Sequence, residues 1–392
     1  MLATVFDPHI WAAVPFSFWS AVCFIFGSVV GSFLNVCIHR IPLNLSVVFP
    51  PSHCPHCKYS IPWYLNIPLL TWVYLKGRCR NCGAPISVRY FLVELLTALL
   101  FLGSWLAFGH FSPLLALIFC GFLAGLVVAS LIDFEHTYVP DGLTYGGMVA
   151  GVLISLLVPI LHGTISPAAA LKYSLLGLLV GAGEIYAVVR FGKLLFGRHH
   201  LPIPPGQRII FTESSIVLPE GEIPYEEVFY RKTDAITLQA SRVELVDRCY
   251  RDAAIRLTPD KLRIGEDEFD PEQVPHLEAE CARTELPRWR VAWLTLRGRD
   301  VEAERTQLVL PREAMGLGDV KMMAAIGAFL GWKAVVFCLL ASSVIGAVVG
   351  VTLIAIGKRA WSSRLPFIPY IALGAILWLF GGWRMVAWLV GR

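Results

Sequence analysis

Two aspartates of this sequence lie where a long apolar run meets a short polar segment. Asp133 ends one such run, and Asp319 follows the segment Gly316-Leu317-Gly318 and precedes the apolar run Met322–Trp332. Gly316 and Gly318 permit unusual backbone angles and the close approach of a substrate strand. Two carboxyl groups held together at a poorly hydrated site share one proton and can act as general base and general acid. This arrangement predicts an aspartic peptidase centre.

Each aspartate also has a simpler interpretation. Asp133 could be a helix-end charge that reaches water, and Gly-x-Gly-Asp could be a turn that caps a helix. Seven acids lie outside the charge-rich segment 198–313, and a carboxylate near hydrocarbon is a functional candidate. These are Asp7, Glu94, Asp133, Glu135, Asp141, Glu184 and Asp319. Asp141, after Val139-Pro140, could cap the following helix or influence Asp133, and both possibilities stay open.

Four cysteines have the spacing of a metal site. Cys54 and Cys57 form one C-x2-C knuckle, and Cys79 and Cys82 form the second after 21 intervening residues. Four thiolates suit tetrahedral zinc, and such a closed site is structural rather than catalytic. His53 and His56 could substitute as ligands. The spacing therefore predicts a structural zinc loop.

The elements that position these residues are apolar helices. Hydrophobic residues make up 56% of the 392 residues and charged residues 16%, against about 25% charged in a soluble domain. About 20 apolar residues span a bilayer, and the hydropathy pattern predicts eight such helices. They lie within 8–39, within 95–132 (two helices), between Gly142 and Arg190 (two helices), from Asp319 to Trp332, at 334–356 and at 367–388.

Residues 198–313 differ from the rest of the chain. They hold 39 of the 62 charged residues, namely 17 Lys and Arg and 22 Asp and Glu. Short β-like runs at 208–211, 235–238 and 291–296 predict one small β-rich domain, which a linker starting at His199 introduces. We expect this insert to dock an assembly partner or to restrain the loop that carries Asp319.

Lysine and arginine gather in alternate loops, which indicates the membrane orientation. Loops 40–89 and 358–364 carry several Lys and Arg, and Arg190, Lys193 and Arg198 follow the fifth span. We therefore expect loops 40–89, 133–141, 190–318 and 358–364 to face the cytoplasm with the N-terminus outside. Because these positive charges lie between apolar runs, they do not indicate nucleic-acid binding. No basic segment and cleavage site of a signal peptide are recognised at the start of the sequence.

The ordered motifs resemble those of the bacterial type IV prepilin peptidases, which are leader peptidases and N-methyltransferases of the GxGD type. The resemblance covers nearly the whole chain outside the insert. It rests on residues 31–42, both cysteine knuckles, 66–72, 86–90, 93–96, Ile132-Asp133 with Val139-Pro140-Asp141, and Gly316–Asp319 with Lys321.

The resemblance implies an enzyme whose catalytic pair is Asp133 and Asp319, with Gly316, Gly318, Lys321 and Asp141 supporting the site. It implies cytoplasmic-side cleavage of the basic leader of type IV prepilins or type II secretion pseudopilins. Methylation of the new N-terminal residue with S-adenosylmethionine would follow, in the bacterial inner membrane. The resemblance places the methyl-donor site within the cytoplasmic loop 40–90 and assigns no individual residues to it.

Three features depart from the family pattern. Ile368 stands where many members have Gly, Phe91 stands where Pro is common, and Asp133 and Asp319 lie 186 positions apart because of the insert. Two alternatives remain: a transporter with acidic relay residues, and a methyltransferase or scaffold without peptidase activity.

The predicted fold is a polytopic α-helical membrane protein with a cytoplasmic zinc loop and a soluble insert. We expect these segments: 1–42, first transmembrane helix; 43–90, zinc-binding loop; 91–197, helices two to five with Asp133; 198–313, insert; 314–392, GxGD loop and helices six to eight.

Overall fold

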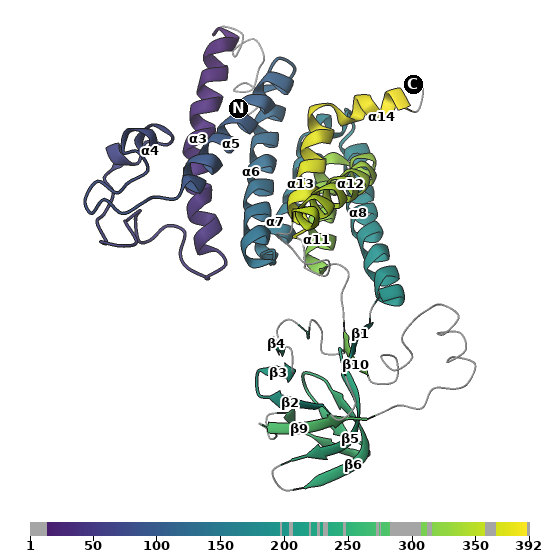
Figure 1. Ribbon diagram of the computed structural model, residues 1–392. Coiled ribbons are helices and arrows are strands. Elements are labelled where there is room, and N and C mark those ends of the chain that lie inside the picture. The colour runs from purple at the N-terminus through teal and green to yellow at the C-terminus, as the bar shows by residue number, and fades with distance from the viewer. Residues whose placement is uncertain are drawn as a thin grey trace. The chain divides into compact units, whose positions relative to one another are not determined.

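The computed structural model describes most of the chain. The described residues are 14–196, 198–203, 207–218, 221–225, 228–229, 234–245, 248–271, 274, 276–282, 307–311, 316–356 and 366–389. The chain divides into two compact units. One comprises Met1–Ala187 and Leu317–Arg392 and is helical, and the other comprises Val188–Gly316 and is built on a β-sheet (Figure 1).

The eight predicted helices of the first unit are all present. They are α3 (Phe16–Arg40), α5 (Val88–Phe108), α6 (Pro113–His136), α7 (Asp141–Leu157), α8 (Pro167–Phe196), α11 (Leu317–Leu330), α12 (Trp332–Ala355) and α13 (Ile368–Leu377). The last continues as a π-helical segment (Trp378–Gly382) and α14 (Trp383–Leu389), with a kink at Gly381. Shorter helical turns are η1 (Trp63–Leu65), α4 (Leu70–Tyr74) and η2 (Pro159–His162).

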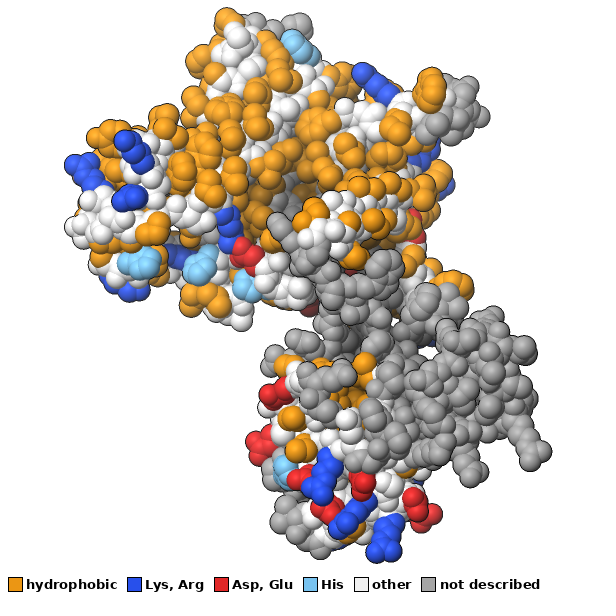
Figure 2. Space-filling view, in the orientation of Figure 1, with side chains coloured by type: hydrophobic (Ala, Val, Ile, Leu, Met, Phe, Trp, Pro, Cys, Tyr) orange, Lys and Arg blue, Asp and Glu red, His pale blue; other side chains and the backbone are white. Residues whose placement is uncertain are grey.

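The lengths and surfaces of these helices are those of a multi-pass membrane protein. Among the described residues, 6 helices are long and apolar enough to cross a membrane, while α7 has 17 residues and α11 has 14. Large apolar side chains such as Ile25, Val344 and Val351 are more than 60% exposed. Figure 2 shows that hydrophobic side chains dominate the visible surface of the helical unit. An apolar outer surface of this extent matches hydrocarbon rather than water.

Glycines allow two of the helix pairs to approach closely. A Cβ atom on Gly177 of α8 would lie 2.1 Å from the carbonyl oxygen of Gly327 in α11, and one on Gly181 would lie 2.5 Å from that of Met323. A Cβ atom on Gly31 of α3 would lie 2.7 Å from the Cα of Glu94 in α5. Small residues at such contacts let backbones pack directly, as is typical of membrane helices.

The second unit is a sheet of 10 antiparallel strands. Their bounds are β1 (Arg198–Pro202), β2 (Arg208–Thr212), β3 (Ser215–Leu218), β4 (Gly221–Pro224), β5 (Ile236–Glu244), β6 (Cys249–Leu257), β7 (Leu262–Ile264), β8 (Asp267–Phe269), β9 (His276–Cys281) and β10 (Gln307–Pro311). The main path runs β4-β3-β2-β9-β5-β6-β7-β8, and β10 pairs with both β1 and β5.

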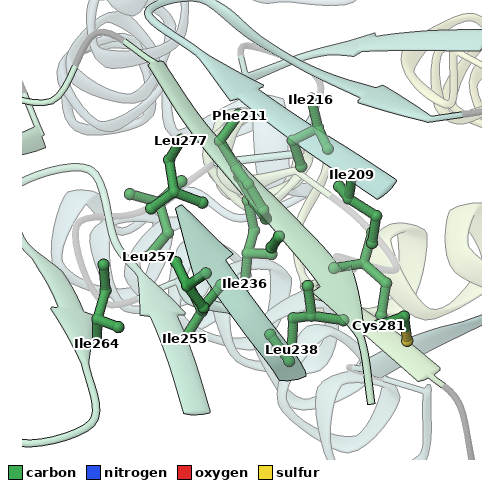
Figure 3. Packing of buried hydrophobic residues seen from close by; sticks show 14 of the residues in the cluster. Ile209, Phe211, Ile216, Ile236, Leu238, Ile255, Leu257, Ile264, Leu277 and Cys281 are labelled. Atoms are coloured by element: carbon green, nitrogen blue, oxygen red, sulfur yellow. The ribbon is translucent and has the colours of Figure 1, made fainter. Parts of the chain in front are cut away.

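Alternating side chains give this sheet one buried face. Ile209, Ile236, Ile255 and Leu277 are at most 1% exposed, and Figure 3 shows them gathered in one apolar cluster. The predicted β-rich insert is therefore confirmed. The predicted strands at 208–211 and 235–238 fall on β2 and β5, whereas 291–296 lies outside the described residues.

The two ends of the insert are paired with each other. Residues 198–202 form β1 rather than a linker, and Arg198 lies opposite Pro311 of β10 in antiparallel register. The linker prediction is wrong for residues 199–202, because their partner strand is more than 100 residues away in sequence. The end of the predicted linker, at 204–205, lies outside the described residues. Paired residues in such a ladder are about 5 Å apart, so a long insertion separates its two attachment points very little.

Candidate active site and metal centre

Asp133 lies in the last turn of α6 and is 6% exposed. A negative charge is unfavourable at the C-terminus of its own helix, where carbonyl dipoles point outward. The N-terminus of α13 compensates, because the backbone N–H of Ile368 donates a hydrogen bond of 3.1 Å to Asp133 Oδ2. Helix α6 then ends at Thr137, whose left-handed conformation and N–H bond to the Asp133 carbonyl terminate it.

Asp319 lies in the first turn of α11 and is 8% exposed. An acid is favourable there because the helix N-terminus presents free N–H groups and a positive dipole end. Gly318 packs against Val139, since a Cβ atom on this glycine would lie 3.4 Å from Val139 Cγ2. The Gly-Leu-Gly-Asp segment therefore contacts the residues just before α7.

The helices carrying the two aspartates run in opposite directions. α7 and α11 are parallel, because Asp141 contacts Lys321 near their starts and Gly151 contacts Ala328 further along both. α7 follows α6 after a four-residue turn and reverses its direction. α11 is therefore antiparallel to α6.

A ring contact fixes the relative height of the two aspartates. Phe122 of α6 and Phe329 of α11 have ring centroids 4.9 Å apart. Phe122 precedes Asp133 by 11 positions, and Phe329 follows Asp319 by 10. At about 1.5 Å per residue, Asp319 lies about 15 Å and Asp133 about 16.5 Å along its helix from this contact, toward the same end of the helix pair.

Two of the predicted supporting residues form an ion pair. Lys321 Nζ lies 2.5 Å from Asp141 Oδ1, and the same ammonium lies 4.9 Å from the centre of the Tyr145 ring. Asp141 is the first residue of α7, so its charge also suits that helix end. The pair joins two motifs that are 180 positions apart.

Sequence reasoning missed two partners of this region. The sequence does not predict the Ile368 N–H as a partner of Asp133, because a backbone donor leaves no mark in residue types. Arg89, at the start of α5, forms an ion pair with Glu135, two residues after Asp133. Glu135 had been noted only as one of the acids outside the insert.

The four cysteines form one cluster, as predicted. Their sulfur atoms all lie within 4.8 Å of one another, and Cys54 Sγ is 3.8 Å from Cys82 Sγ. Zinc–sulfur bonds of about 2.3 Å in a tetrahedron place sulfurs about 3.8 Å apart. His53 instead directs Nδ1 to the Pro51 carbonyl at 3.0 Å. The donor set and spacing fit a structural zinc ion held by the four thiolates.

The two knuckles have the same backbone design. Lys58 N–H donates to the Cys54 carbonyl and Gly83 N–H donates to the Cys79 carbonyl, and both donors have left-handed φ angles. Each knuckle is closed by a small antiparallel bridge. The Asn81 side chain donates to Cys57 Sγ, and this hydrogen bond, followed by one from the Tyr59 backbone, lowers the pKa of that thiol to about 6. The lowered pKa favours the thiolate that binds metal.

A cavity of about 630 Å³ lies between the cysteine loop and helices α3 and α5. Aromatic side chains of its lining include Trp72, Tyr90 and Phe91, and the Trp72 and Phe91 rings lie 5.2 Å apart. Arg40 closes part of the loop by donating to the carbonyls of Ser46 and Pro50. The volume and the apolar lining with a few polar groups are those of a small-molecule site.

The fold and the two centres define a multi-pass membrane protein with a candidate carboxylate pair and a four-cysteine metal site. The chain belongs to the type IV leader peptidase family, whose model matches residues 120–198 and 291–351. The model of the bacterial peptidase A24 N-terminal domain matches residues 25–108. The family inferred from the motifs is confirmed, and the interval between the matched parts contains most of the insert.

Curated relatives agree with this assignment. A prepilin leader peptidase/N-methyltransferase of Aeromonas hydrophila is 27% identical over 399 residues, covering 96% of this chain and 94% of that protein. The Klebsiella pneumoniae protein of that name is 38% identical over 200 residues, covering 50% and 83%. The Myxococcus xanthus protein is 42% identical over 195 residues, covering 45% of this chain and 56% of its own length. No solved structure matches the chain.

Proposed function

We propose that this chain is a membrane aspartic endopeptidase that removes the basic leader of type IV prepilins or type II secretion pseudopilins. It then methylates the newly exposed N-terminal residue. The peptidase assignment rests on one relationship: Asp133 and Asp319 are both buried, and the Phe122–Phe329 contact together with the helix rise brings them to similar heights on antiparallel helices. Family membership favours this function over a proton-relay transporter.

The two carboxyl groups would divide the chemistry of peptide hydrolysis. In a poorly hydrated site one carboxyl stays protonated because two adjacent negative charges are unfavourable. The ionised member accepts a proton from the attacking water, and the protonated member donates one toward the peptide carbonyl or the leaving amine. Each carboxyl group has a local feature that favours its charged form: the Ile368 N–H donates to Asp133, and Asp319 lies at the N-terminus of α11.

The supporting residues have separate tasks in this proposal. Gly318 allows the first turn of α11 to pack on Val139. Gly316 would permit the backbone angles and close approach that a substrate strand needs. The Lys321–Asp141 pair holds the starts of α11 and α7 together. The site would face the cytoplasm of the bacterial inner membrane, where the basic leader of a prepilin remains. The Lys and Arg residues of loop 40–89, and Arg190, Lys193 and Arg198 after the fifth span, support this orientation.

The cysteine loop and the adjacent cavity support the methylation step. S-adenosylmethionine carries a flat heteroaromatic base and a sulfonium cation, and aromatic faces suit both. Trp72, Tyr90 and Phe91 provide such faces in a cavity of about 630 Å³. When bound, the donor supplies a methyl group to the substrate amine, which loses a proton, and the donor leaves as a neutral thioether. The zinc ion would keep the loop folded around this cavity.

The dyad is tested by prepilin cleavage in membranes with wild type, Asp133→Asn and Asp319→Asn. We expect each substitution to lower the cleavage rate at least about a thousandfold, since members of a catalytic pair act as a unit. Methyl transfer to a peptide that already carries the processed N-terminus should persist and serve as the control for folding. Normal cleavage by either variant would show that the dyad assignment is wrong, and this also tests the alternative of a non-peptidase scaffold.

We further propose that the insert docks a pilus or secretion assembly protein or restrains the loop carrying Asp319. Arg198 and Pro311 are paired, so residues 199–310 can be replaced by a linker of about three Gly and Ser residues. We expect the shortened protein to fold but to alter processing or pilus assembly. Unchanged processing together with unchanged assembly would eliminate this role.

A further inference from the structure

Glu94 is the acidic residue of the cavity beside the cysteine loop. It lies in α5 and is 8% exposed, and it is the one acid among the described residues that line this cavity. The charged groups of the lining are otherwise basic, such as Arg40 and Arg80. Neither the peptidase chemistry nor the zinc site uses this carboxyl group.

A hydrogen bond restrains the Glu94 side chain, and a close helix contact restrains its backbone. Its Oε2 accepts a hydrogen bond of 2.8 Å from the backbone N–H of Leu69. Behind it, Gly31 brings helix α3 directly against the Glu94 backbone, where a Cβ atom would lie 2.7 Å from Cα. The Leu69 hydrogen bond therefore holds the carboxyl group at the wall of the cavity that Ile67 and Pro68 also line.

Leu69, at this wall of the cavity, has a strained backbone conformation. It has φ 63° and ψ −53°, a conformation that costs an ordinary residue about 1–3 kcal/mol. The neighbouring residues Ile67 and Pro68 line the cavity. Strain of this kind persists where the surrounding structure over-determines it, and the Glu94 hydrogen bond is one such restraint.

A carboxylate in an apolar cavity attracts a cation more strongly than one in water does, because the local dielectric constant is low. A sulfonium ion has no N–H group to donate, so charge and aromatic faces are the means of recognising it. The cavity combines one carboxyl group with the rings of Trp72, Tyr90 and Phe91.

We propose that the Glu94 carboxylate binds the positive charge of a sulfonium methyl donor in this cavity. The inference rests on the proposed methylation function and extends it by naming the residue that recognises the donor's charge. It makes Glu94 a binding residue for methylation and gives it no part in leader cleavage.

Equilibrium binding to the purified full-length protein in detergent tests the proposal. The ligands are S-adenosylmethionine and S-adenosylhomocysteine, which lacks the sulfonium charge. Glu94→Gln keeps the size of the side chain and an oxygen that can accept from Leu69 N–H, but removes the charge. We expect it to weaken S-adenosylmethionine binding about tenfold or more and S-adenosylhomocysteine binding less than about threefold. Glu184→Gln, a glutamate outside the cavity lining, is the matched control and should change neither.

Each other outcome contradicts a defined part of the argument. Equal weakening of both ligands would show that Glu94 only shapes the cavity, and unchanged binding of both would remove it from the site. Failure of the wild type to bind either ligand would overturn the donor cavity itself, while leaving leader cleavage untouched. Prepilin cleavage reports whether Glu94→Gln is folded. If this variant does not cleave prepilin, the proposal is tested with the wild-type protein instead. A donor analogue with a charged amine in place of the sulfonium must then bind about tenfold tighter than the neutral thioether, and equal affinity overturns the proposal.

Discussion

Lys321 Nζ lies 2.5 Å from Asp141 Oδ1, so an ion pair joins the first turn of α11 to the first residue of α7. The Asp141 side chain is 66% exposed, and such exposed pairs contribute at most about 1 kcal/mol to stability. The pair therefore matters less for holding the fold together than for aligning the two segments next to Asp133 and Asp319.

We expect Lys321→Met to lower the cleavage rate about tenfold, because small displacements of a catalytic group have large kinetic effects. The free energy of unfolding should change by no more than about 1 kcal/mol. Cleavage kinetics and thermal unfolding of the purified protein measure the two effects. Lys333→Met, at the exposed start of α12, is the control, and full activity of Lys321→Met would remove the alignment role.

The hydrogen bond from the Ile368 N–H to Asp133 predicts which substitutions of Ile368 preserve cleavage. Because the N–H group and not the side chain contacts Asp133, Ile368→Ala and Ile368→Gly should keep the cleavage rate per folded molecule within about threefold. Ile368→Pro removes this N–H and should lower the rate at least about tenfold. Cleavage assays normalised to folded protein distinguish them, and a strong loss in Ile368→Ala would show that the side chain itself acts.

The close contact between α8 and α11 at Gly177 predicts that a larger residue there destabilises the protein. A Cβ atom there would lie 2.1 Å from the Gly327 carbonyl, so Gly177→Ala must push α8 away from α11. We expect a loss of roughly 2 kcal/mol in unfolding free energy. Gly183→Ala, on the same helix with nothing within 4 Å of the added carbon, should change it by less than about 0.5 kcal/mol. Denaturation in detergent measures both, and equal behaviour of the two variants would contradict the close contact.

The cysteine cluster predicts that metal supports methylation more than cleavage. Replacing Cys54 and Cys79 with Ser should abolish zinc binding and lower methyl transfer about tenfold or more, while cleavage stays within about threefold. Metal analysis and the two activity assays measure this. Cys249→Ser, an exposed thiol of the β-sheet unit, is the control. Complete loss of cleavage in protein that remains folded would contradict a structural role for the zinc.

Much of the architecture was predictable from sequence because it depends on local properties. A run of about 20 apolar residues must become a helix in a bilayer, since its backbone groups have no other partners there. Two C-x2-C knuckles were sufficient to predict the sulfur cluster, because each knuckle forms its own turn. The family followed from the order of the motifs.

The tertiary structure decided the relationships between helices. Nothing in the residue types of α13 shows that the Ile368 N–H reaches Asp133 across 235 positions, or that Arg89 pairs with Glu135. Both contacts depend on which helix faces pack together. The helix packing brings Asp133 and Asp319 to similar heights. Strand pairing within the insert brings its two ends, β1 and β10, together. Hydropathy and residue spacing determine where helices and cysteine knuckles form. Which residues contact one another depends on how the helices pack, and no short segment of sequence encodes that packing.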